Sequence, residues 1–279
     1  MRETSNPILR SLPKQSGGYA QFGTGMAGAA NQMTFQADPY APQQTGVSRP
    51  LTVDDVVTKT GITLAVLSVA AVVSYFLVGA NVALAMPLTL IGSLGGLALV
   101  LIASFGRKQD NPAIVLSYAA LEGLALGAIS WLFGNVLVQG VSAGALITQA
   151  VLGTIGVFFG MLVVYKTGAI RVTPKFTRMM VASMVGVLVL MLGNFVIGMF
   201  SHGPGPLRDG GTLSIIFSLV VIGIAAFSFL IDFDAADQMI RAGAPEKAAW
   251  GIALGLTVTL VWLYHEILRL LSNFYSSDR

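Results

Sequence analysis

The sequence contains no cysteine, two histidines and few charged residues. The absence of cysteine excludes disulfide bonds, thiolate metal sites and a cysteine nucleophile. Charged residues make up 10% of the chain, whereas a soluble domain carries about 25%. The P-loop, GxSxG, HExxH and paired GxGD-type patterns are missing, so we predict a protein that is not an enzyme and needs no cofactor. The net charge of +3 is small and its basic residues lie between apolar segments, which argues against a nucleic-acid surface.

Long apolar segments fill most of the chain instead. A segment of about 20 apolar residues, rising about 1.5 Å per residue, crosses the hydrocarbon core of a bilayer. Seven such segments are predicted at residues 57–79, 83–105, 112–136, 144–165, 179–200, 212–231 and 248–271. The chain is therefore predicted to be an all-α integral membrane protein, with seven transmembrane helices in a domain of residues 51–275 and the lipid bilayer as its first partner.

Helix-end signals refine these boundaries. Thr52 is a candidate N-cap before two acidic residues, and Pro112 suits the first turn of a helix. Nothing breaks the sixth helix before Gly243, so it is predicted to continue to about residue 242. Asp232 would then lie about 15 Å from that helix end, within the bundle.

Loop composition predicts the topology. Residues 1–50 are polar and rich in Gly, Pro, Gln and Ser, which predicts a flexible cytoplasmic tail. Lysine and arginine concentrate in this tail and in the second-to-third and fourth-to-fifth links. Positive residues stay on the cytoplasmic side, so the N-terminus is predicted to lie on the cytoplasmic side of the cell membrane. Seven spans put the C-terminus outside. Arg269 and Arg279 favour the alternative, in which the last segment is re-entrant and the C-terminus is inside.

The last span carries a stripe of small and polar residues. At spacings of three and four, the stripe shares one helix face and consists of Gly251, Gly255, Thr259, Trp262, Glu266 and Arg269. Such a stripe must face protein or water. Inserting a charged side chain into the membrane within a span costs about 2.5–3.5 kcal/mol of free energy, so we expect Glu266 to have a function or a stabilising partner. Either it forms a structural ion pair with Arg269 or it lines an ion path.

Glu122 lies about ten residues into the third span. Gly123 and Gly127 beside it form a GxxxG pair, which predicts the close approach of another backbone. One interpretation is a protonated carboxyl that donates a hydrogen bond between helices. The other is a titratable group on an ion or proton path.

Three acids end the sixth span at Asp232, Asp234 and Asp237. Neighbouring carboxylates can bind Ca²⁺ or share a proton. An EF-hand loop is excluded because its glycine and its twelfth-position glutamate are missing. Asp232 lies deepest and is the candidate for a transient Ca²⁺ contact. The alternative is that all three are solvated acids at the membrane edge.

Three patterns resemble the transmembrane Bax-inhibitor-motif family, in its bacterial YccA-like branch. They are the segments 121–130 (LEGLALGAIS), 230–234 (LIDFD) and 263–271 (LYHEILRLL). The resemblance implies six helices around a central seventh and a pH-sensitive calcium leak. It also implies an aspartate pair that shares a proton, in which Asp232 matches the first member, and a helix-seven arginine, matched by Arg269, that holds the closed state. The second aspartate falls at Thr259, which cannot titrate, so Glu122 or Glu266 is the candidate replacement.

Three functions therefore compete. The first is a calcium or cation leak gated by carboxylates, with Asp232 and Glu122 on the path. The second is a regulator of a membrane protease or of stress responses, acting by protein–protein contact through the tail. The third is a proton-coupled transporter, whose inverted repeats are not evident in the sequence.

Overall fold

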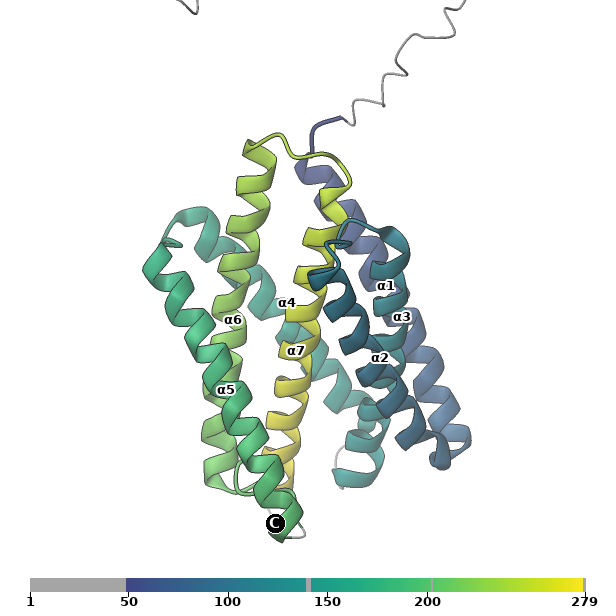
Figure 1. The fold of residues 1–279 in the computed structure, drawn as a ribbon. Helices are drawn as coiled ribbons and strands as arrows, with labels where there is room; N and C mark the ends of the chain where they lie inside the picture. Colours follow the sequence, from purple (N-terminus) through teal and green to yellow (C-terminus); the bar gives the residue numbers. More distant parts are fainter. Residues whose placement is uncertain (1–48, 139–141, 202, 278–279) are drawn as a thin grey trace, which may run out of the picture. The chain divides into compact units, whose positions relative to one another are not determined.

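The computed structural model describes residues 49–138, 142–201 and 203–277. Within these residues all regular segments are helical, and seven are long and apolar enough to cross a membrane (Figure 1). The helices are α1 (Val53–Ala80), α2 (Ala85–Phe105), α3 (Pro112–Leu132), α4 (Ala143–Thr167), α5 (Pro174–Ser201), α6 (Thr212–Arg241) and α7 (Ala248–Ser277). A short 3₁₀ turn η2 (Val82–Leu84) precedes α2, and a π-helical turn η3 (Phe133–Leu137) follows α3. The seven predicted spans are confirmed; of the predicted tail, residues 1–48 lie outside the described part.

The helix ends follow from local sequence. Thr52 and Asp55 form a capping box at the start of α1, and Pro112 occupies the first turn of α3. Gly243 has φ 65°, the left-handed conformation that ends a helix, so α6 continues to Arg241 as predicted. The unbroken α7 has the length and composition of a full span, which favours a crossing over a re-entrant segment.

Helix α7 packs against four other helices: α1, α3, α4 and α6. The principal partner of α2 is α3, and the principal partner of α5 is α6. The arrangement of six helices around a central seventh therefore stays a prediction.

Helices α1 and α3 approach very closely through the two glycines of the GxxxG pair. A Cβ at Gly127 would overlap the carbonyl oxygen of Ala71, and one at Gly123 would overlap that of Leu67. Ser74 Oγ donates a hydrogen bond of 2.6 Å to the carbonyl oxygen of Leu124 across the same contact. The prediction of a close backbone approach is confirmed, and the partner is α1.

The two ends of the bundle differ in charge. The start of α1 and the α2–α3, α4–α5 and α6–α7 links lie at one end, and the other three links lie at the opposite end (Figure 1). Ten of the described lysines and arginines fall at the first end: Arg49, Lys59, Arg107, Lys108, Lys166, Arg171, Lys175, Arg178, Arg241 and Lys247. Arg208 and Arg269 lie at the second end.

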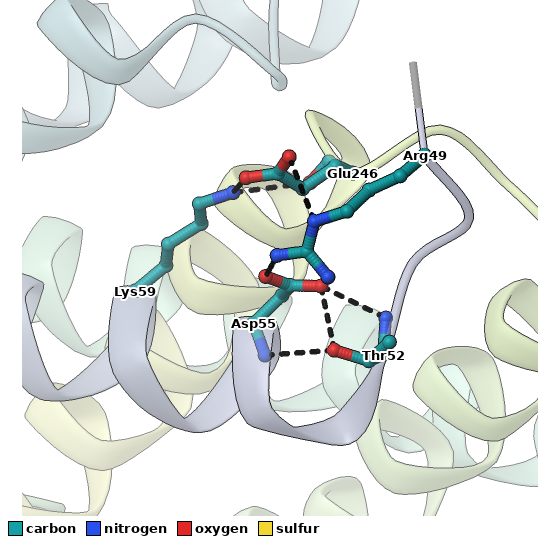
Figure 2. A network of polar contacts seen from close by, with 5 residues as sticks. All are labelled: Arg49, Thr52, Asp55, Lys59 and Glu246. Atoms are coloured by element: carbon teal, nitrogen blue, oxygen red, sulfur yellow. Dashed lines mark hydrogen bonds and ion pairs between the residues drawn. The ribbon is translucent and has the colours of Figure 1, made fainter. Parts of the chain in front are cut away.

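An ion-pair network at the first end ties the residues before α1 to the α6–α7 link (Figure 2). Glu246 accepts from Lys59 Nζ at 2.9 Å and lies 3.4 Å from Arg49 Nε, while Arg49 also pairs with Asp55 at 2.5 Å. The Leu51 amide donates to the carbonyl oxygen of Ala244, and the Glu246 amide donates to that of Arg49. These contacts hold Arg49 and Pro50, the last residues of the predicted tail, against the link.

Candidate functional site

Asp232 and Thr259 meet between α6 and α7. Thr259 Oγ1 donates a hydrogen bond of 2.7 Å to Asp232 Oδ2. The other carboxylate oxygen, Oδ1, faces Gly255, where an added Cβ would lie 3.9 Å away. Among the described residues no lysine or arginine lies within ion-pair distance of Asp232. The position that the family resemblance assigns to a second aspartate is therefore in contact with Asp232, but it supplies a hydroxyl.

The polar stripe of α7, predicted to face protein or water, lies against other parts of the protein. Gly251 lies against Gln109 of the α2–α3 link, and Gly255 and Thr259 face Asp232. Trp262 packs against a buried cluster of Val187, Phe217 and Val221, and Leu207 of the α5–α6 link packs against the same cluster. Small residues at the first positions of the stripe let these neighbours approach the α7 backbone closely.

The other two acids of α6 face Tyr165 of α4, whose hydroxyl lies within hydrogen-bond distance of both. Asp234 accepts hydrogen bonds from Gln238 Nε2 at 2.6 Å and from the Tyr165 hydroxyl at 3.4 Å. Asp237 pairs with Arg241 at 2.8 Å. The structure therefore separates Asp232 from Asp234 and Asp237, because residues two apart on a helix point in different directions. Groups of three or more metal-ligating side chains are absent from the described part of the chain.

Glu266 is surrounded by the two arginines of the second end. Its side chain is 3% exposed and its Oε1 lies 3.0 Å from Arg269 Nη1 and 3.6 Å from Arg208 Nη2. Burial lowers the pKa of the Arg208 guanidinium, and the Glu266 carboxylate opposes that shift. The ion pair with Arg269 was one of the two interpretations of Glu266, and the structure contains it; Arg208 from the α5–α6 link is an addition to it.

The α5–α6 link is held in place by Asn194 of α5. Asn194 Nδ2 donates to the carbonyl oxygen of Pro204 at 2.9 Å, and its Oδ1 accepts from the Leu207 amide at 2.8 Å. These two bonds fix the link from which Arg208 reaches Glu266. Asn194 and Arg208 are not among the predicted site residues, although an asparagine within an apolar span is a usable signal in the sequence.

Glu122 lies apart from the α6–α7 pair. It faces α2, where a Cβ on Gly96 would lie 2.5 Å from its Oε2. Within the described residues no hydrogen bond or ion pair joins Glu122 to Asp232 or to Glu266. Within the described residues, the three candidate carboxylates thus lie at separate places: Asp232 with Thr259, Glu122 beside α2, and Glu266 between two arginines.

Seven apolar helices with carboxylates inside the bundle define a multi-pass membrane protein. A family model described as Bax inhibitor 1 like matches residues 6–276, and the chain belongs to that family. A search of curated proteins gives no match to the chain.

Proposed function

We propose that this protein is a pH-sensitive leak for calcium or another cation across the cell membrane, which in bacteria is the inner membrane. The concentration of lysine and arginine at the first end of the bundle supports a cytoplasmic N-terminus. Membership of the Bax inhibitor 1-like family supports a membrane function.

The Asp232–Thr259 contact carries this proposal. Asp232 is a carboxylate between two spanning helices, about 14 Å from the end of α6 at the helical rise, and has no basic partner among the described residues. A carboxylate in such a place is expensive and marks an ion or proton pathway by default. Its Oδ1, beside Gly255, is available to a passing cation or to a proton.

The small number of oxygen ligands favours passage over storage. Ca²⁺ takes about six to eight oxygen ligands in a stable site. Asp232 and the Thr259 hydroxyl supply only a few, and conduction requires binding that is weak enough to release the ion. We assign Asp232 as the transient Ca²⁺ contact, with Glu122 as a second carboxylate on the path.

A single carboxyl gives the pH dependence in this mechanism. The hydrogen bond from Thr259 is charge-assisted while Asp232 is ionised, and it becomes an ordinary bond when Asp232 is protonated. Protonation therefore weakens a tie between α6 and α7 and shifts the population of their arrangements. The helices are also held by the contacts of Asp234 with Tyr165 and of Glu266 with Arg269, which do not involve Asp232.

Calcium entry into phosphatidylcholine liposomes that contain the purified protein tests the proposal. Flux is measured at pH 6 and pH 8 for wild type, Asp232→Asn and Glu122→Gln, with Asp237→Asn as the matched control on α6. We expect a flux that differs between the two pH values in wild type and Asp237→Asn, and that loses this difference in Asp232→Asn. Wild-type flux equal to that of empty liposomes at both pH values would refute the leak.

The regulatory function is the second candidate, and the network in Figure 2 favours it. Because residues 49–51 bond to the α6–α7 link, a partner protein that holds residues 1–48 would be connected directly to α6 and α7. Deleting residues 1–45 should then abolish capture of a membrane protease or other partner without unfolding the bundle. Capture that survives the deletion would remove the tail from this function.

A further inference from the structure

A groove opens between α1 and α4 on the side of the bundle away from the Asp232–Thr259 contact. Its volume is about 820 Å³, and it is backed by α3 and α7. Helix α1 packs mainly against α3 and α7, and α4 packs mainly against α6 and α7, so α7 is left facing the space between them. We call this space the α1–α4 groove; residues of α7 that line it are Leu260, Val261 and Tyr264.

The groove is lined mainly by apolar side chains, and three of its hydroxyl groups already have partners. The hydroxyls of Ser130 and Tyr264 share a hydrogen bond of 2.8 Å, and Thr154 Oγ1 donates to the carbonyl oxygen of Ala150 at 2.8 Å. No unsatisfied hydroxyl among these three calls for a polar ligand, and an apolar space does not hold water well. The occupant that fits is therefore apolar.

The mouth of the groove is continuous with the lipid-facing surface. Its rims carry large apolar side chains exposed by 40–69%, at Val72, Phe76, Val151 and Ile155. In a chain that spans a membrane, such side chains lie against the hydrocarbon core. The groove therefore opens sideways into lipid, not toward water.

The length of the groove matches one leaflet. Its lining along α4 runs from Gly144 to Ile155, about 17 Å at the helical rise. Half of a hydrocarbon core of about 30 Å is about 15 Å. The lined parts are the second half of α1 and the first half of α4, so the groove lies in the leaflet near the α1–α2 and α3–α4 links.

The groove is too small to enclose a whole helix. A helix about 10 Å across and about 17 Å long occupies about 1,300 Å³, more than the groove contains. We propose that the α1–α4 groove binds one acyl chain of a membrane phospholipid, which enters from this leaflet and contacts α7. Lipid is thereby in direct contact with the helix that carries Thr259.

Photocrosslinking in a defined membrane tests this binding site. The full chain is reconstituted in phosphatidylcholine vesicles in which a small share of the lipid carries a diazirine in the middle of one acyl chain. After irradiation, digestion and mass spectrometry, we expect adducts on residues 260–264 of α7 as well as on the outer faces of α1 and α4. Lipid that only surrounds the protein would label the outer faces alone, and that result would overturn the proposal.

Two glycines of α4 supply a matched pair of variants. A Cβ at Gly144 or at Gly156 would meet nothing within 4 Å, but only Gly144 lines the groove. Gly144→Phe should reduce labelling of residues 260–264 at least several-fold, whereas Gly156→Phe should leave it unchanged. Labelling of Phe159, exposed by 57%, reports the folded lipid-facing surface in both variants.

The outcomes separate the possible occupants. An equal loss of α7 labelling in both variants, with Phe159 labelled normally, would refute the groove as the route. Because the chain lacks cysteine, a single cysteine in place of Thr148 reports a second copy through disulfide-linked dimers. Dimers through this position together with unlabelled α7 would assign the groove to a second chain and overturn the lipid proposal.

Discussion

Replacing Gly127 with alanine tests the close contact of α1 and α3. The added Cβ would overlap the carbonyl oxygen of Ala71 and would lie 2.8 Å from Ser74 Cβ. Ordinary contact between carbon atoms is about 3.5–4.0 Å, so the helices must separate by about 0.7–1.2 Å at Ser74 and more at the carbonyl. Both obstacles are fixed to the α1 backbone, so no side-chain rotation relieves them.

The magnitude follows from three contributions. Alanine in place of glycine stabilises a helix interior by about 1 kcal/mol. Overpacking of this kind costs about 3 kcal/mol, and separation loses the Ser74–Leu124 hydrogen bond, worth about 0.6 kcal/mol in a membrane protein. Gly127→Ala should therefore lower the free energy of unfolding by about 2–3 kcal/mol.

Gly61 of α1 is the matched control, because a Cβ there would meet nothing within 4 Å. Gly61→Ala should leave stability unchanged or raise it by up to about 1 kcal/mol. Unfolding of both variants is measured by titration with sodium dodecyl sulfate in mixed micelles, followed by circular dichroism. Equal unfolding midpoints for the two variants would show that α1 and α3 do not pack at this distance.

Three further predictions concern the polar contacts. Thr259→Val removes the hydroxyl that bonds α7 to Asp232 and should increase calcium flux into liposomes at pH 8. Thr257→Val is the control, because the Thr257 hydroxyl bonds within α7, and it should leave the flux unchanged. Equal flux in the two variants would remove the Thr259–Asp232 bond from the mechanism. Glu266→Gln leaves Arg208 and Arg269 without a counter-charge and should lower the free energy of unfolding by about 3 kcal/mol. Asp237→Asn, at an exposed ion pair, should change the unfolding midpoint little in the same detergent titration. Glu246→Gln weakens the ion pairs with Arg49 and Lys59 and should speed hydrogen exchange at the Leu51 amide. Exchange as slow as in wild type would mean that the backbone hydrogen bonds hold this segment against the α6–α7 link without the ion pairs.

The candidate site was predictable in part from the sequence. The helical repeat places Thr259, Glu266 and Arg269 on one face, which made the Glu266–Arg269 pair one of two interpretations, and the structure contains that pair. The resemblance matched Asp232 to the first aspartate of a pair and placed the second at Thr259, and the structure brings these two side chains into hydrogen-bond contact. Spacing along α6 could not show that Asp234 faces Tyr165 of α4, because that partner lies 69 residues away in the chain.

The sequence by itself determined the class of protein and the positions of the seven helices. Apolar segments must satisfy their backbone hydrogen bonds internally in lipid, so their lengths and their end signals suffice to define helices. The tertiary structure alone decided the cross-chain partners: Arg208 with Glu266, Lys59 with Glu246, and the groove between α1 and α4. These contacts depend on how helices far apart in sequence are rotated and spaced against one another, which the local periodicity of a single helix does not specify.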